Sequence, residues 1–221
     1  MAASRNAVRA AAMASVLAGV LALGANPVAA AVINGSFETG DFTGWTQTLA
    51  GGSQQVVSSH VGVNGTAYSP IGGSYFAVLG GGDGNRLVSI EQDLALGMGD
   101  MLSGWAFFSS NEFVPLELTD PNDFASVEVF GSSGALVAQP FYLDAATIGG
   151  LVDGPWTSWS FTAPTSDTYT LRLGVANDVD MLFPSEAGFD DINLRRVPEP
   201  SSLLALCVGL LASGVRRRAQ G

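Results

Sequence analysis

The chain has 221 residues, including 28 glycines, one histidine, one cysteine and no lysine, and its formal charge is −11 at pH 7. Residues 32–196 contain four arginines and 19 acidic residues, a formal charge of −15. This charge excludes nucleic acid as a partner, because binding the phosphate backbone requires a basic surface. The absence of lysine excludes Schiff-base chemistry, and a single histidine excludes a multi-histidine metal site.

The first 31 residues have the three parts of a secretory signal peptide. Arg5 and Arg9 form the basic start, residues 10–25 form the apolar run, and residues 28–31 form the small-residue end. We expect the secretion translocon to export the chain and cleavage to follow Ala31. The alternative is an uncleaved anchor, for which an apolar run of about 16 residues is short against the roughly 20 that a spanning helix needs.

Short apolar or alternating segments fill residues 32–196, and Gly, Asn, Asp, Ser and Pro separate them. This pattern lacks helical periodicity and is typical of a single all-β domain. We expect a two-sheet jelly-roll β-sandwich, with a signal helix before it and a short transmembrane sorting helix after it. The predicted strands are Gln54–His60, Tyr75–Leu79, Leu87–Leu94, Met101–Ser110, Phe124–Phe130, Leu136–Leu143, Thr157–Ala163, Thr168–Ala176 and Gly188–Arg195. His60 would lie at the surface, at the end of its strand.

Two motifs mark the ends of this domain. It opens with Asn-Gly-Ser-Phe-Glu at residues 34–38, followed by Gly40-Asp41 and Gly44-Trp45, and closes with Phe-Asp-Asp-Ile-Asn-Leu at residues 189–194. Together they resemble the galactose-binding-like jelly rolls, which include several carbohydrate-binding modules. We expect Trp45 to belong to the core.

The resemblance also implies a structural calcium ion that joins the two ends of the domain. Calcium prefers six to eight oxygen ligands, and carboxylates supply them well. Period-two alternation places Asp190 on the core face beside Ile192, where a carboxylate needs a partner. The alternative is that turn amides or Arg195 satisfy the acidic side chains. The predicted metal ligands are Glu38, Asp41, Asp190 and Asp191.

Aromatic side chains that could stack on a sugar are a second candidate site. Trp159 shares strand parity with Phe161, and Trp105 with Phe107, so both tryptophans are expected in the core. Trp156 follows Pro155 in a turn-like stretch and is expected to be exposed, so we predict that Trp156 and Tyr68 contact a ligand. The full set of candidates is Tyr68, Tyr75, Trp105, Phe113, Trp156 and Trp159.

The last 25 residues, 197–221, form a separate segment. Pro198-Glu199-Pro200 interrupts regular structure, residues 201–215 are an uncharged apolar run that contains Cys207, and Arg216-Arg217-Arg218 follows as a basic stop. This order resembles the PEP-CTERM sorting signal of Gram-negative bacteria, whose tail is recognised by an exosortase. It implies transient anchoring in the inner membrane and then release to the cell surface or extracellular matrix. The alternative is an ordinary single-pass anchor.

The sequence therefore predicts an exported, exosortase-sorted protein with a non-catalytic β-sandwich. Extracellular polysaccharide is the predicted ligand, and a purely structural or adhesive matrix component is the main alternative. A glycan-active hydrolase is a third hypothesis, because it needs only two carboxylates on either side of a sugar. Two or more exposed aromatic residues on one concave face would favour sugar binding.

Overall fold

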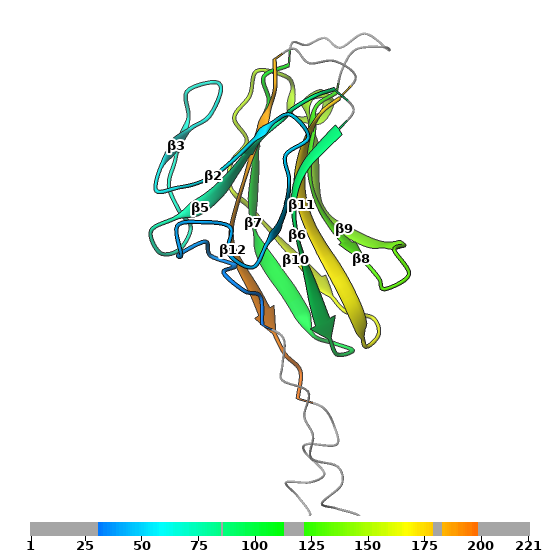
Figure 1. Cartoon of the computed structure of the whole chain (residues 1–221). Helices are drawn as coiled ribbons and strands as arrows, with labels where there is room; N and C mark the ends of the chain where they lie inside the picture. The colour runs from blue at the N-terminus through cyan, green and yellow to red at the C-terminus, as the bar shows by residue number, and fades with distance from the viewer. Residues whose placement is uncertain (1–30, 85, 113–121, 179–182, 199–221) are drawn as a thin grey trace, which may run out of the picture. The chain divides into compact units, whose positions relative to one another are not determined.

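The computed structural model describes residues 31–84, 86–112, 122–178 and 183–198. Two five-stranded antiparallel sheets pack face to face as a sandwich, which confirms the predicted all-β jelly roll (Figure 1). The first sheet runs in the order β1 (Thr46–Thr48), β6 (Arg86–Leu96), β11 (Asp167–Asn177), β8 (Phe124–Phe130), β9 (Leu136–Asp144). The second runs in the order β10 (Thr157–Thr162), β7 (Met101–Ser109), β12 (Glu186–Arg195), β5 (Phe76–Gly80), β2 (Ser53–Val57).

Two small elements complete the described part of the chain. Strands β3 (His60–Val61) and β4 (Ala67–Tyr68) form a separate hairpin, and helix α2 (Ala145–Ile148) follows β9. The predicted strand Gln54–His60 is therefore divided, because β2 leaves the sheet edge after Val57 and His60 pairs with Tyr68 instead of β5. The other eight predicted strands occur within two residues of their expected ends, and Phe124–Phe130 is unchanged.

The core lies between the two sheets and follows the period-two alternation of the strands. Trp45, Trp159 and Phe161 are buried in it, as predicted. Trp105 and Phe107 share parity, but that parity faces away from this core: β7 turns Leu102, Ala106 and Phe108 inward instead. In the first sheet, β6 and β11 contribute the core residues Val88, Ile90, Leu94, Leu96, Tyr169, Leu171, Leu173 and Val175.

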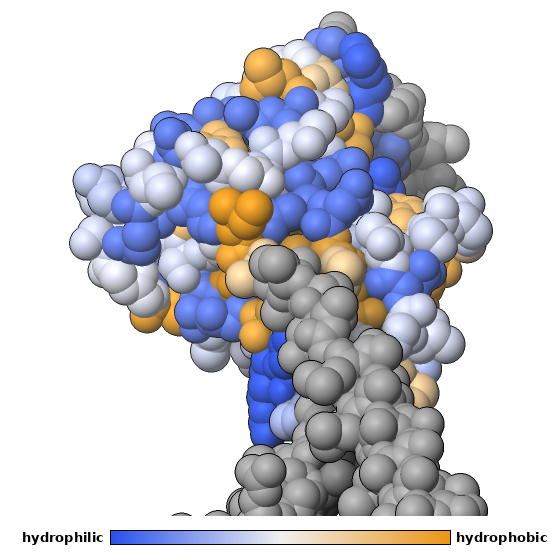
Figure 2. Space-filling view, turned by 60° about the horizontal axis from the view of Figure 1, so that its bottom comes forward, coloured by the Kyte–Doolittle hydropathy of each residue, from blue (hydrophilic) through white to orange (hydrophobic). Residues whose placement is uncertain are grey.

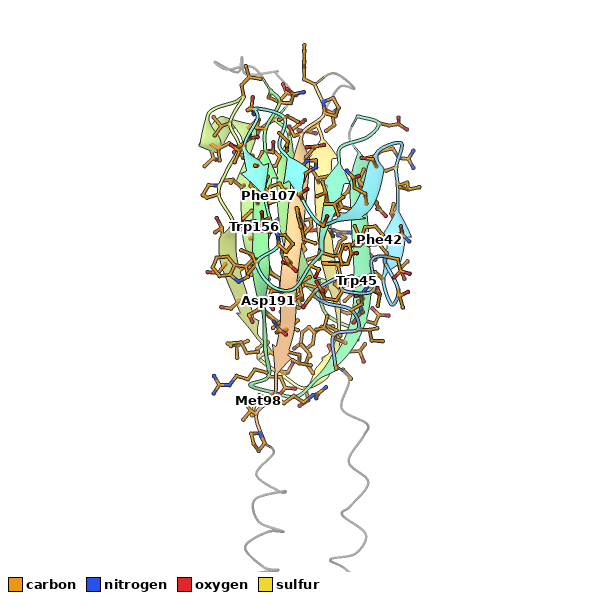
Figure 3. The ribbon with its side chains drawn as sticks, turned by 90° about the vertical axis from the view of Figure 1, so that its left-hand side faces the viewer. Phe42, Trp45, Met98, Phe107, Trp156 and Asp191 are labelled. Atoms are coloured by element: carbon orange, nitrogen blue, oxygen red, sulfur yellow. The ribbon has the colours of Figure 1, made fainter. Side chains whose placement is uncertain are left out.

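A second apolar cluster covers the outer face of the second sheet. Phe107 stacks face to face on Tyr68 of the β3–β4 hairpin, with ring centroids 3.7 Å apart, and Phe76 belongs to the same cluster. Trp156 meets Phe107 edge to face at 4.7 Å, and Figure 3 shows the two side by side. The hairpin and Trp156 thus close this face, which leaves the outer face of the first sheet as the open one.

A bulge in β12 changes the direction of the closing motif. Asp191 has a φ of 52°, and the register with β7 shifts between Asp190 and Asn193. As a result Phe189 and Ile192 both reach the core, and Asp190 points to the outer face of the second sheet. The prediction that Asp190 shares the core face with Ile192 was therefore wrong, because uninterrupted alternation was assumed.

His60 is not a plain surface residue. Its Nε2 atom lies 2.7 Å from Glu186 Oε2, and the two side chains are only 13% and 23% exposed. This contact ties the β3–β4 hairpin to β12. The expected surface role fails because the hairpin folds back over the sheet instead of continuing β2.

The described residues from 31 to 197 form one compact unit. Among the residues with described positions, no helix is long and apolar enough to cross a membrane. Several predictions lie outside the described residues. They concern residues 1–30 of the signal peptide, Phe113, and the tail from Glu199 onward, which contains the predicted transmembrane run and Arg216, Arg217 and Arg218.

Candidate functional site

A groove of about 450 Å³ lies on the open outer face of the first sheet. Strands β6 and β11 form its floor, and the turn between β8 and β9, visible on the right in Figure 1, borders it. Its lining combines one guanidinium, one ring, two carboxylates and several hydroxyls. The lining residues are Glu91, Asp93, Phe130, Gly131, Ser132, Gly134, Thr168, Thr170 and Arg172.

Strand alternation brings these side chains together. On β11, Leu171 and Leu173 point into the core, so Arg172 between them points out. Antiparallel pairing then sets Arg172 opposite Glu91 on β6 and opposite Glu128 on β8. The groove is therefore a direct product of register, because a one-residue slip would bury these polar side chains.

Arg172 is the centre of the polar network. Its Nε and Nη2 atoms donate to Glu128 Oε2 at 2.9 and 2.7 Å, and its Nη1 atom lies 3.9 Å from Glu91 Oε1. The guanidinium carbon sits 4.3 Å from the ring centroid of Phe130, a cation–π contact. These contacts fix the guanidinium in one orientation. The guanidinium and the Phe130 ring together form a flat surface in the groove.

Asp93 and Thr170 add a second polar pair to the groove. The Thr170 hydroxyl donates to Asp93 Oδ1 at 2.6 Å, and Asp93 is otherwise exposed. Hydroxyls and carboxylates together offer both donors and acceptors. The groove can therefore form several hydrogen bonds with a polyhydroxylated ligand.

An aromatic pair stands on the same outer face, further along β8. Phe124 shares parity with Glu128 and Phe130, and its ring stacks on Tyr142 of β9 at 5.5 Å. Tyr142 is 46% exposed. Burial and the nearby Asp144 carboxylate raise the pKa of the Tyr142 phenol above its ordinary value of 10.0. From Phe124 to Phe130 this face offers aromatic residues over roughly 20 Å.

The two aromatic residues predicted to contact a ligand belong to the closed face instead. Tyr68 is 4% exposed, and its hydroxyl donates to Gly154 O at 2.7 Å. Trp156 is half-buried, and its Nε1 donates to Ser69 O at 3.1 Å. A sugar-stacking role does not fit Tyr68, because its ring is already stacked on Phe107.

Glu38 and Asp190 are brought to the same loop, residues 71–75. Ser74 N and Tyr75 N donate to Glu38 Oε1 at 2.8 and 2.9 Å. Ile71 N and Gly72 N donate to Asp190 Oδ2 at 2.7 and 3.2 Å. The opening and closing motifs are thus linked through one loop, and turn amides satisfy both carboxylates. This was the alternative that the sequence left open.

The other two predicted metal ligands lie in local turns. Asp41 Oδ1 accepts hydrogen bonds from the Thr39 hydroxyl and the Thr43 amide, which lower the pKa of its carboxyl. Asp191 Oδ1 accepts a hydrogen bond from Asn193 Nδ2 at 2.7 Å. In the described part of the chain no three His, Cys, Asp or Glu side chains gather as a metal site, and amide N–H groups do not ligate a cation. In this arrangement backbone amides donate to Glu38 and Asp190, and calcium binding stays a prediction.

Sequence reasoning missed the groove residues Glu91, Asp93, Phe130 and Arg172. The signal that could have found Glu91, Asp93 and Arg172 is present in the predicted strands Leu87–Leu94 and Thr168–Ala176, whose polar residues alternate with Leu, Ile and Val. Phe130 ends a different predicted strand, Phe124–Phe130. Alternation alone could not show which polar sheet face remains open. The hairpin that covers the other face consists of two strands of two residues each, which are too short to give a pattern in the sequence.

Asp153 provides a pH test of the covering hairpin. Its carboxylate accepts hydrogen bonds from the Ser109 hydroxyl and from the amides of Asn64 and Thr66. Burial acts to raise the pKa of Asp153, but these hydrogen bonds outweigh it and hold the pKa below its ordinary value of 3.8. The stabilisation is therefore complete above pH 3.8 and is lost as the pH falls through the lower folded-state pKa.

We expect Asp153→Asn to melt at a lower temperature than the wild type at pH 6, and the difference to shrink below pH 3.8. Thermal unfolding followed by circular dichroism between pH 2 and 7 measures both. A constant difference across this range would show that the Asp153 charge does not stabilise the hairpin.

The chain shares one sequence motif with known proteins. Residues 196–218 match the PEP-CTERM protein-sorting motif, which confirms the predicted sorting signal and indicates an exported, surface-sorted protein. No curated protein matches the chain.

Several solved structures are similar to the chain at low sequence identity. They include the carbohydrate-binding module TmCBM61 in complex with β-1,4-galactotriose, at 15% identity over 76% of this chain and 100% of that chain, with a TM-score of 0.46. The K3 cleaved adhesin domain of Lys-gingipain from Porphyromonas gingivalis has 15% identity, 76% and 100% coverage, and a TM-score of 0.49. An apo-form cyclase from Fischerella sp. has 17% identity, 76% and 97% coverage, and a TM-score of 0.43. These similarities are in the fold alone.

Proposed function

We propose that this protein is exported, processed at its C-terminal sorting signal by an exosortase, and displayed at the cell surface or in the matrix, where it binds polysaccharide without cleaving it. The inner membrane would hold the chain only until the tail is processed. The observation that supports polysaccharide binding is the groove around Arg172, on the sheet face that the hairpin leaves open.

The charge of the groove favours one class of polysaccharide. Glu91 and Asp93 line it, Glu128 neutralises Arg172, and residues 32–196 carry a formal charge of −15. Uronic-acid polymers would be repelled by this field. Neutral polysaccharides, or those that carry amino groups, are therefore the proposed ligands.

We expect Phe130→Ala and Arg172→Ala to weaken binding about tenfold each, because each removes half of the flat surface in the groove. Tyr75→Ala is the matched control, since Tyr75 is exposed by 37% and is not among the groove residues. Isothermal titration with cello-oligosaccharide, chitosan oligomers and polygalacturonate measures affinity.

We expect cello-oligosaccharide and chitosan oligomers to bind and polygalacturonate not to bind. If no glycan binds the folded domain, the structural or adhesive role replaces the proposal. Equal loss in Tyr75→Ala would show that the groove is not the site.

A hydrolase would need an acid with a raised pKa in contact with substrate. Burial raises the pKa of Asp190, although the amides of Gly72, Asp191 and Ile71 oppose it. Asp190 is fully buried beneath the 71–75 loop, on the closed sheet. This placement supports a structural role for Asp190 and the non-catalytic proposal.

A further inference from the structure

Asp100 lies in the turn between β6 and β7, beside Met98, which Figure 3 labels at the lower end of the domain. It is 2% exposed. Its carboxylate accepts hydrogen bonds from Gly97 N at 2.9 Å, Val197 N at 2.9 Å and Arg196 Nη1 at 3.2 Å. The backbone oxygen of Asp100 accepts Ala163 N at 2.8 Å, which fixes the turn to the end of β10.

The contacts of Asp100 attach two residues beyond the end of β12, Arg196 and Val197, to the domain. The β12–β7 ladder ends at Arg195, opposite Met101. Beyond Arg195, the Arg196 side chain also donates a hydrogen bond to Ala95 O at 3.1 Å. The Val197 side chain lies close to Gly99, because a Cβ added at Gly99 would be 3.5 Å from it. The chain is therefore fixed to the domain up to the residue directly before Pro198.

The lower end of the domain carries exposed apolar residues around this anchor. Met98 is 70% exposed and Val197 is 51% exposed, and Figure 2 shows hydrophobic residues among hydrophilic ones on this end. Val197 thus keeps its side chain accessible while its amide is occupied.

Processing enzymes commonly bind their substrates as extended segments through backbone hydrogen bonds. Pro198 and Pro200 have no N–H, so Glu199 carries the one amide donor within the motif. The next donor toward the domain is Val197 N, which Asp100 occupies. An enzyme that reads the segment before the motif must first take Val197 away from Asp100.

We propose that Asp100 is a positioning residue for tail processing: it holds Arg196 and Val197 on the folded domain, so that cleavage must wait for their local release. This rests on the proposed processing of the tail. If opening is fast relative to cleavage, the cleavage rate follows the fraction of molecules that are open. Weakening the anchor then raises the rate.

The test is a pulse–chase of the full-length chain in its own host, in which the tail-bearing and processed forms are separated by gel. We expect Asp100→Asn to be processed about tenfold faster, since a hydrogen bond between charged groups is lost. Asp83→Asn, the same change at an exposed position outside the groove, is the control and should match the wild type. Alanines at residues 198–200 should stop processing.

Insertion of Gly-Ser-Gly-Ser between Val197 and Pro198 separates the effect of the Asp100 contacts on processing from their effect on the stability of the domain. The insert supplies about 13 Å of free chain, so processing should be fast with the anchor intact, and Asp100→Asn should add nothing to it. Amide exchange on residues 32–197 should show faster exchange at Val197 in Asp100→Asn and unchanged exchange at Phe189.

Three results would overturn the inference: wild-type processing in Asp100→Asn, slower processing in the insertion variant, or an additive effect of the two changes. If the wild type and the alanine variant of the motif are equally unprocessed, the proposed sorting itself fails, and the role of Asp100 fails with it.

Discussion

Phe107→Ala is expected to lower the free energy of unfolding by about 3–5 kcal/mol, the range for truncating a buried phenylalanine. Phe107 is fully buried and contacts Tyr68, Phe76 and Trp156. The change leaves a cavity beneath the β3–β4 hairpin. Gly188 lies against the Phe107 ring and has no side chain that could fill this cavity. Urea denaturation of residues 32–197 measures the loss.

Tyr142→Ala is the control for this variant, since its ring is 46% exposed on the open face. A loss of less than about 1 kcal/mol is expected there. A loss below about 1 kcal/mol for Phe107→Ala would contradict the conclusion that the hairpin is packed on the sheet.

Asp190→Ala is expected to cost about 3 kcal/mol, because it leaves three partly buried amides without their carboxylate acceptor. These are the N–H groups of Ile71, Gly72 and Asp191. Asp190→Asn keeps one acceptor oxygen and should lose less. Denaturation at neutral pH compares the two, and equal stability of the wild type and Asp190→Ala would refute the amide linkage.

The same variants separate amide linkage from the calcium site that the sequence predicts. Amide linkage alone predicts equal melting temperatures for the wild type in millimolar calcium and in chelator. A bound ion would raise the melting temperature by several degrees, and Asp190→Ala would remove that rise. Such a result would establish the ion in place of the amide linkage.

Much of the fold could be predicted because alternation and turn residues carry its pattern locally. Leu171 and Leu173 point inward as the period-two pattern requires, and the same pattern turns Arg172 outward. Trp159 and Phe161 reached the core for this reason. The sorting motif was equally predictable, because its residues are contiguous in the sequence.

The rest depended on long-range contacts that leave no local pattern. The bulge at Asp191 reverses the parity of Asp190, although two adjacent aspartates do not by themselves indicate a bulge. The burial of Tyr68 depends on a hairpin that folds over Phe107, nearly 40 residues away in the chain. The hairpin and Trp156 together determine which sheet face stays open, and therefore where a ligand can bind.

The most direct test of the central claim is a titration of ¹⁵N-labelled residues 32–197 with a neutral oligosaccharide, followed by two-dimensional NMR. The proposal predicts that the shifted amides cluster on β6, β11 and the β8–β9 turn around Arg172 and are weakened in Arg172→Ala. Shifts confined to the closed face near Trp156, or no shifts at millimolar ligand, would contradict it.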